Sequence, residues 1–342
     1  DITFISSAAL SGPLQEIGTQ YSRGIESYFN VINDNGGIDG HKIKFRILDD
    51  QYEPINTQQN IEKLIAENKN IYAILGVVGT PTSEEALKIA IKKDIPFLMP
   101  FSGADFLYNS KYKNLFTLRP SYQQEANEMV KYLTENNLTK IAIFYQNDSY
   151  GLSALKAIKK ATQNSNIKIV SDGVYNRNTI SIRLAFDEIK KGAPQAVIMA
   201  GAYKPTNEFI AKYEKSGLRA EFLNFSFVGM DFLKVAAKNS TNKILITQAT
   251  PCLDSNNSDT KEYLQNFLHY FPDAKPNSVA LEGYLAAKVI VAALQKSKHI
   301  NKNEFIKSLS ELNLTLFDTN SLTYSKNNRN GLQKVYLLEV AK

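Results

Sequence analysis

Small hydroxyl-bearing residues gather in two turns that each follow an apolar, strand-like run. The first turn, residues 79–83, reads GTPTS, and the second, residues 102–104, reads SGA. Hydroxyls and free backbone N–H groups at the start of a helix bind anionic groups such as carboxylates. Neither turn holds a histidine, a cysteine or an acidic residue, so the pattern favours holding a small molecule over transforming it.

The residues after the first turn predict the helix that would present these groups. Thr82 and Glu85 fit a T-x-x-E capping box, which predicts a helix beginning at Thr82 with its free N–H groups directed at the turn. A similar S-x-x-Q pattern at Ser121 and Gln124 predicts another helix over residues 122–135.

Strand-like and helix-like segments alternate along most of the chain. Apolar runs such as IKFRILD, KIAIFY and AVIMA read as strands, and apolar residues at helical spacing predict a helix over residues 17–35. This alternation predicts an α/β protein with parallel sheets covered on both faces. In such sheets ligands bind at the carboxyl ends of the strands, where both hydroxyl-rich turns are expected.

Composition excludes several classes of protein. The chain has 342 residues, a net charge of +6 and one cysteine, Cys252. The basic residues are dispersed among acidic ones, without a basic stripe or a base-reading motif, so nucleic-acid binding is not expected. The three histidines lie far apart, so we expect no metal and no cofactor. No apolar run approaches the roughly 20 residues that cross a membrane, so no membrane-spanning segment is expected. We also expect that a signal peptide was removed.

The length and the pattern predict two domains joined by several crossings. Crossings are expected near residues 119–121, 248–251 and 318–321. We therefore predict one lobe from residues 1–119 and 250–319, and another from residues 120–249 and 320–342. The last segment reads as two strands with a turn at Asn330 and Gly331, a strong hairpin signal.

The order and spacing of several segments resemble a known family. GTPTS and PFSGADFL are similar to its two ligand-facing turns, LRPSYQQEA to its first crossing, IAIFYQNDSYG to the opening of its second lobe, and LEGYLAAKVIVAAL to its returning helix. The chain resembles the periplasmic type I solute-binding proteins of ABC transporters, in the branched-chain amino-acid (Leu/Ile/Val)-binding group. The resemblance covers nearly the whole chain.

This resemblance implies a fold and a function. The fold would be α/β, with two Rossmann-like lobes that have parallel central sheets and are joined by a three-crossing hinge. Hinge closure would trap a small ligand, an amino acid or a related organic acid. The protein would act outside the cytoplasm as a monomer without chemistry of its own, and deliver its ligand to an ABC permease in the membrane.

The resemblance also implies ligand contacts. In the family a hydroxyl at the position of Thr80 binds the ligand carboxylate, and the turn of Ser102, Gly103 and Ala104 receives the ligand ammonium. Aromatic residues of the second lobe cover the ligand at the positions of Tyr150 and Tyr203.

Ser226 departs from the family pattern. Leucine-binding members carry an acidic residue here for the ligand's ammonium, and an unpaired buried charge is costly. Glu282 and Asp231 are candidate replacements. A carboxylate without an amine, or an aromatic acid, is the alternative ligand.

Two other functions compete with transport. A ligand-binding sensory domain of a membrane receptor or kinase would share the fold and the pocket. An enzyme is disfavoured, because the G-x-G-x-x-G dinucleotide fingerprint and the G-x-S-x-G nucleophile elbow are both missing.

Overall fold

The computed structural model describes residues 1–341, and its internal contacts divide the chain into two compact units. Unit 1 comprises Asp1–Ser102, Phe106–Arg119 and Thr250–Lys334. Unit 2 comprises Gly103–Asp105, Pro120–Ala249 and the chain from Val335 on. The chain therefore changes unit at 119/120 and 249/250, where we expected crossings, but the last change falls at 334/335 and not near residue 319.

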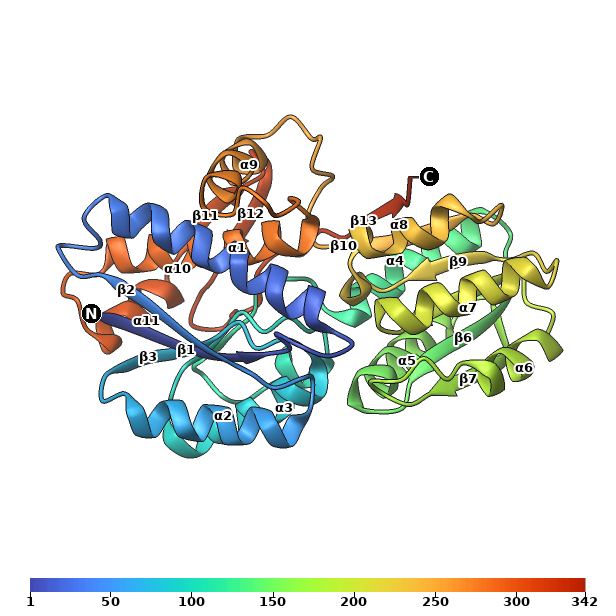
Figure 1. The fold of residues 1–342 in the computed structure, drawn as a ribbon, viewed down its shortest axis with the longest axis horizontal. Coiled ribbons are helices and arrows are strands. Elements are labelled where there is room, and N and C mark those ends of the chain that lie inside the picture. Colours follow the sequence, from blue (N-terminus) through green and yellow to red (C-terminus); the bar gives the residue numbers. More distant parts are fainter. Residues whose placement is uncertain (342) are drawn as a thin grey trace. The chain divides into compact units, whose positions relative to one another are not determined.

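Unit 1 is built on a parallel sheet with the strand order β2-β1-β3-β4-β5 (Figure 1). Its strands are β1 (Ile2–Ala8), β2 (Ile43–Asp49), β3 (Ile71–Leu75), β4 (Phe97–Leu98) and β5 (Leu115–Phe116). Every residue of β1 is buried, as expected for a central strand covered on both faces.

Helices cover both faces of this sheet. Figure 1 shows α1 (Gln15–Asp34) and α10 (Ser278–Lys296) on one face, and α2 (Pro54–Glu67) and α3 (Thr80–Lys93) on the other. Unit 1 also contains α9 (Ser258–Tyr270) and α11 (Lys302–Ser310). Helix α1 buries Ile17, Tyr21, Ile25 and Phe29, which recur every four residues and so share one face of the helix.

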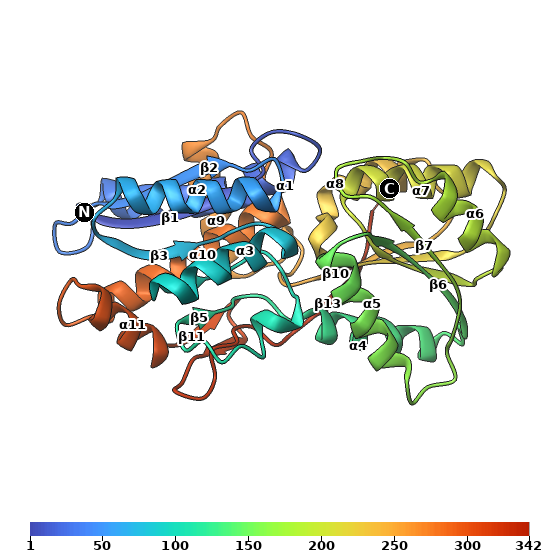
Figure 2. The same cartoon turned by 90° about the horizontal axis from the view of Figure 1, so that it is seen from below.

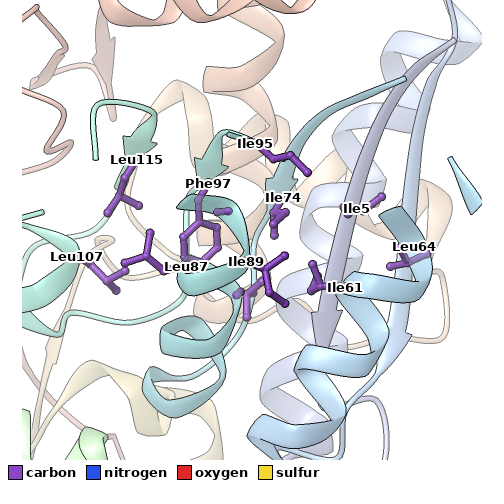
Figure 3. Packing of buried hydrophobic residues seen from close by; sticks show 13 residues of the cluster. Ile5, Ile61, Leu64, Ile74, Leu87, Ile89, Ile95, Phe97, Leu107 and Leu115 are labelled. Atoms are coloured by element: carbon purple, nitrogen blue, oxygen red, sulfur yellow. The ribbon is translucent and has the colours of Figure 1, made fainter. Parts of the chain in front are cut away.

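The core beneath α2 and α3 is aliphatic. Ile61 and Leu64 of α2 and Ile89 of α3 pack with Ile5 of β1 and Ile74 of β3, and all are at most 8% exposed (Figure 3). This packing fixes α3, and therefore its first turn, against the sheet.

Helix α10 corrects one expectation. It is apolar and long enough to cross a membrane, with a mean hydropathy of 1.3 over its most apolar window. However, 83% of that window is buried inside the protein, which is the pattern of a core helix. No other helix of residues 1–341 meets the same length and hydropathy limits.

Unit 2 has a second sheet with the strand order β13-β10-β9-β8-β6-β7. Its strands are β6 (Lys140–Gln146), β7 (Lys168–Tyr175), β8 (Ala196–Ala200), β9 (Glu221–Asn224), β10 (Ile244–Gln248) and β13 (Tyr336–Glu339). All neighbours pair in parallel except β13, which runs antiparallel to β10. The predicted parallel sheets are thus confirmed.

The helices of unit 2 also lie on both faces of the sheet. Figure 2 shows α4 (Tyr122–Glu135) and α5 (Ser149–Thr162) on one face, and α7 (Tyr203–Lys215) and α8 (Met230–Lys238) on the other. Helix α6 (Arg183–Lys191) packs on β7. The predicted capping box is present at the start of α4, where the Ser121 hydroxyl accepts from the Gln124 N–H and the Gln124 side chain accepts from the Ser121 N–H.

The predicted hairpin at Asn330 and Gly331 is wrong. The antiparallel pair is instead β11 (Asn313–Leu316) with β12 (Asn320–Thr323), and the next strand, β13, joins the sheet of unit 2. Gly331 packs against the backbone of Leu118, where a Cβ atom would lie 2.5 Å from the carbonyl oxygen. Its small size therefore serves a close approach of two backbone segments, not a tight turn.

The same contacts explain why the last change of unit comes late. The Tyr324 hydroxyl donates to the Thr117 carbonyl, and the Leu332 N–H donates to the Leu118 carbonyl. These bonds tie residues 324–332 to the chain after β5, so this segment stays with unit 1.

Candidate functional site

The topology places the site at the carboxyl ends of particular strands. In unit 1 the order reverses between β1 and β3, because the chain leaves β1 for β2 on one side and β3 for β4 on the other. In unit 2 it reverses between β6 and β8. Loops at such switch points form the ligand sites of open α/β sheets. Helix α3 follows β3, and helices α5 and α7 follow β6 and β8, so Thr80, Tyr150 and Tyr203 all lie in the first turns at switch points.

Helix α3 begins earlier than its sequence predicts. It starts at Thr80 behind Gly79, and the Thr82 hydroxyl donates to the Val78 carbonyl at 2.5 Å instead of capping the helix. Gly79 has a φ of 106°, and a Cβ atom there would lie 2.3 Å from the Tyr52 ring. Glycine adopts this backbone conformation more readily than any other residue, so Gly79 allows the helix to begin at Thr80. The predicted capping box at Thr82 is therefore wrong.

The two hydroxyl-rich turns meet as expected for neighbouring parallel strands. The Phe101 N–H donates to the Val77 carbonyl at 2.8 Å, and the Gly79 N–H donates to the Phe101 carbonyl at 3.2 Å. The hydroxyl oxygens of Thr80 and Ser102 lie 2.7 Å apart, and both side chains are fully buried. Backbone bonds therefore hold the two hydroxyls together at the start of α3.

Ser83 is a site candidate that our sequence reasoning missed. It lies in the first turn of α3 and is fully buried, and its hydroxyl makes no hydrogen bond within residues 1–341. A buried hydroxyl without a partner is unfavourable by about 1–3 kcal/mol, which a ligand oxygen would offset. The signal was present in the run T-x-T-S, which places three hydroxyls in one helical turn.

The second turn divides its roles between neighbouring residues. Ser102 contacts Thr80, whereas the Gly103 carbonyl accepts from the Tyr122 N–H at 2.7 Å. A Cβ atom on Gly103 would lie 2.6 Å from the Tyr122 ring, so glycine is required for this approach. Ala104 is fully buried.

The two predicted tyrosines begin helices of unit 2. The Asp148 carboxylate caps α5 by accepting from the Tyr150 N–H, and the Tyr150 ring packs 4.7 Å from the Phe227 ring, centroid to centroid. Tyr203 begins α7, packs 5.3 Å from Phe232 and lines a groove of about 720 Å³ between α7 and α8.

Ser226 lies directly behind β9 and is paired with an acid that sequence reasoning missed. Its N–H donates to one oxygen of Glu125 at 2.9 Å, and its hydroxyl donates to the other oxygen at 2.7 Å. The Thr247 hydroxyl also donates to Glu125, at 2.5 Å. Glu125 is only 2% exposed. It lies 101 positions from Ser226 in the chain, and no local pattern signals this contact.

The two acids proposed to replace the missing one have other partners. Glu282 forms a buried ion pair with Arg119, with N–O distances of 2.8 and 3.1 Å. Asp231 pairs with Lys234 one turn later in α8. Because their charges are balanced by bases, both acids are weaker candidates for a ligand ammonium than Glu125.

The buried carboxylate of Asp50, directly after β2, holds neighbouring segments of unit 1 together. Asp50 accepts hydrogen bonds from Ser7, from Thr57 and from the Tyr52 N–H. Burial raises the pKa of Asp50 to about 6, although these hydrogen bonds oppose the rise. Asp50 thereby positions Tyr52, whose ring packs beside Gly79.

Residues 1–341 hold no group of histidine, cysteine and acidic side chains arranged to bind a metal ion.

Comparison with known proteins decides the family. A family model described as periplasmic binding protein matches residues 6–342. The chain belongs to this family. The resemblance noted in the sequence is therefore confirmed, and the periplasmic binding protein family consists of solute-binding proteins that act outside the cytoplasm.

Two relatives of this periplasmic binding protein are described as leucine, isoleucine and valine-binding proteins or their homologues. A Leu/Ile/Val-binding protein homolog 7 of Brucella abortus is 21% identical over 96% of this chain and 86% of its own. A structure described as a possible leucine/isoleucine/valine-binding protein from Rhodopirellula baltica is 31% identical, with a TM-score of 0.90 over 98% of this chain and 93% of its own.

Two more distant structures share the fold and carry ligands. A branched-chain amino acid ABC transporter protein of Thermus thermophilus, with bound valine, is 18% identical with a TM-score of 0.86, over 100% of this chain and 93% of its own. A solute-binding protein of R. palustris, in complex with benzoate, is 20% identical with a TM-score of 0.85, over 99% of this chain and 93% of its own.

Proposed function

We propose that this protein is the solute-binding component of an ABC importer and captures a small carboxylate-bearing ligand. In this proposal the ligand carboxylate binds at the start of α3, and the aromatic residues of unit 2 close over the ligand by hinge motion. The loaded protein then delivers its ligand to a permease, as a monomer and without altering the ligand.

One observation carries this proposal: Thr80, Ser102 and Ser83 gather buried hydroxyls at the N-terminus of a long helix, at a topological switch point. The first N–H groups of a helix have no acceptor within the helix, and the helix dipole favours negative charge there. Both hydroxyls and N–H groups donate to carboxylate oxygens. Residues 79–83 carry no acidic side chain that would repel an anion at the start of the helix.

The ligands of two relatives support the proposal that this protein binds a carboxylate group. They do not indicate which other groups its ligand carries. The Thermus protein holds valine and the R. palustris protein holds benzoate, and these two ligands share only the carboxylate. We therefore expect the carboxylate site to be common to both ligand types, and the contacts of unit 2 to choose between them.

A thermal-unfolding screen tests the proposal. The purified protein is heated with amino acids, aliphatic carboxylates and aromatic acids, and the ligand is then recovered and identified. A ligand at 100 times its Kd adds about 2.7 kcal/mol to the free energy of unfolding, which raises the melting temperature measurably. We expect a carboxylate to stabilise the protein and to be recovered unchanged. Chemical conversion of the ligand, or no response to any carboxylate, contradicts the proposal.

A further inference from the structure

We propose that one face of unit 2, formed by α6, α7 and α8, binds the surface of a lipid bilayer that contains anionic lipids. This α6–α8 face carries protruding aliphatic side chains, two adjoining hollows and a rim of basic residues. The inference goes beyond the proposed function, because it concerns how the protein attaches to a membrane. It depends on unit 2 alone and on no particular ligand.

Three aliphatic side chains protrude from the α6–α8 face. Leu184 of α6 is 71% exposed, Val235 of α8 is 66% exposed, and Ile180, shortly before α6, is 59% exposed. Within residues 1–341 no other large apolar side chain is more exposed than these three, and only Ile55 equals Ile180. Apolar residues that gather on one exposed face mark a surface for another protein or for a membrane.

The groove between α7 and α8 forms one half of this face. It runs from Tyr203 at the start of α7 to Lys215 at its end, about 18 Å apart along the helix axis. The backbone groups inside both helices are hydrogen-bonded within the helices, so the groove offers side chains rather than free N–H or C=O groups. Its apolar lining comprises Ile180, Ile210, Ala211, Phe232, Val235 and Ala236.

A second hollow, of about 430 Å³, adjoins the groove and is lined by Leu184. Ile180 and Glu208 line both hollows, so the two form one continuous surface. Figures 1 and 2 both show α7 between α6 and α8. The groove therefore lies between α7 and α8, and the second hollow between α6 and α7.

The rim of both hollows is basic. Lys204 and Lys215 of α7 line the groove. Arg183 of α6 and Lys212 of α7 line the second hollow. None of these four bases forms an ion pair within residues 1–341, and neither does Glu208. Each other acid of the three helices pairs with a base: Asp187 with Lys190, Glu188 with Lys191, Glu214 with Arg219, and Asp231 with Lys234. Four bases thus stand against one acid that lacks an ion pair.

A bilayer that contains anionic lipids matches these features. Aliphatic side chains enter the boundary between headgroups and acyl chains, while the surrounding Lys and Arg side chains attract anionic headgroups, as on amphipathic helices that lie on membranes. Each base near an anionic bilayer strengthens the binding. The net charge of +6 adds an attraction of longer range.

Two kinds of protein partner fit this face less well. Leu184 lines the second hollow and not the groove, so a rigid helix docked in the groove would leave Leu184 in water. A second copy of this chain, paired through the same face, would bring Lys204 and Lys215 close to the bases of the other copy, and like charges oppose association. Fluid acyl chains instead conform to both hollows.

Cosedimentation with lipid vesicles tests the inference in the intact, ligand-free protein. One set of vesicles is phosphatidylcholine alone, and the other contains one third phosphatidylglycerol. We expect the protein to partition onto the anionic vesicles about tenfold or more strongly than onto the neutral ones, and high salt to release it. No binding to the anionic vesicles at low salt, equal binding to both sets, or a dimer in place of vesicle binding overturns the inference. Each of these results leaves the proposed function intact, because ligand capture is measured separately.

Two double variants test whether the α6–α8 face is the cause. Lys204→Gln with Lys215→Gln removes charge from the rim, and Leu184→Gln with Val235→Gln removes two protruding aliphatic side chains. All four side chains are exposed, so we expect both variants to fold, as checked by thermal unfolding. Each should weaken partitioning onto the anionic vesicles about tenfold or more. If one variant fails to fold, the other decides alone, and unchanged partitioning of a folded variant overturns the inference.

Each double variant has a matched control on another surface. Lys159→Gln with Lys160→Gln removes the same charge from α5, which lies on the opposite face of the same sheet (Figure 2). Ile55→Gln with Ile91→Gln removes two exposed aliphatic side chains from α2 and α3 of unit 1. We expect both controls to bind the anionic vesicles as the wild-type protein does. An equal loss in the controls would mean that net charge or general hydrophobicity causes the binding, which overturns the assignment to the α6–α8 face.

Discussion

The hydroxyl oxygens of Thr80 and Ser102 lie 2.7 Å apart although their residues follow different strands. In our account this pair binds the ligand carboxylate together with the first N–H groups of α3, which differs from the ammonium contact that the resemblance implies for Ser102. Thr80→Ala removes one charge-assisted hydrogen bond, which contributes about 1.5–3 kcal/mol. We expect Kd for the best carboxylate to rise roughly tenfold to a hundredfold, as measured by calorimetry. Thr134→Ala, which removes a hydroxyl bonded within α4, is the control and should leave Kd unchanged.

Ser83 offers a test in which stability and affinity move in opposite directions. Its buried hydroxyl has no hydrogen-bond partner within residues 1–341, so Ser83→Ala should stabilise the ligand-free protein by up to about 1 kcal/mol. The same change should weaken carboxylate binding, because a donor to the ligand is lost. Urea unfolding and calorimetry measure the two effects. A variant that loses stability but keeps its affinity would show that Ser83 is only a packing residue.

Gly79 sets the start of α3, and its replacement should be costly. Gly79→Ala forces an L residue to a φ of 106° and places a methyl group against the Tyr52 ring. Gly36 has a similar φ of 99° with open space around it, so Gly36→Ala measures the backbone strain alone. We expect Gly79→Ala to lower the free energy of unfolding by about 1–3 kcal/mol more than Gly36→Ala. Equal losses in urea unfolding would mean that the Tyr52 contact relaxes freely.

The ion pair of Arg119 and Glu282 should matter for folding and not for selectivity. The guanidinium also lies over the Phe101 ring, 4.1 Å from its centroid. Glu282→Gln leaves a buried charge unpaired and should reduce the free energy of unfolding by about 3–5 kcal/mol, whereas replacing both residues by Met should cost less. A stable Glu282→Gln variant that binds amino acids poorly would instead return Glu282 to the list of ligand contacts.

The raised pKa of Asp50 predicts how the free energy of unfolding changes with pH. Its pKa in the folded protein is raised to about 6, above the value of about 3.9 for an unfolded chain. The folded state therefore binds this proton more tightly, and the resulting stability is complete below the unfolded pKa and lost as the pH rises through 6. Relative to Asp50→Asn, the wild-type protein should gain about 2 kcal/mol between pH 7.5 and pH 4.5. A flat or opposite difference in urea unfolding would refute the raised pKa.

Much of the fold follows from local patterns in the sequence. Alternating strand and helix periodicities predict parallel sheets, and parallel sheets bring successive strand ends to one edge, so the sequence predicts that the two hydroxyl-rich turns lie side by side. The direct contact between Thr80 and Ser102 comes from the structure. The start of α3 differs from the prediction because Gly79 adopts a backbone conformation that overrides the Thr82 capping pattern.

Contacts between distant segments could not be predicted in this way. Glu125 and Ser226 are 101 positions apart, and each sits in a locally unremarkable sequence. The sequence neighbours of Gly331 predict a hairpin turn, whereas the constraint on this residue is its close approach to the backbone of Leu118. Such pairings depend on tertiary packing, which no single stretch of residues records.

The most direct test of the carboxylate site compares each stabilising acid with its primary amide in the thermal-unfolding assay, such as leucine with leucinamide. The two molecules have the same shape, but only the acid places a negative charge at the start of α3. We predict that the acid raises the melting temperature and that the amide at the same concentration does not. An equal rise with the amide would contradict the assignment of the start of α3 as a carboxylate site.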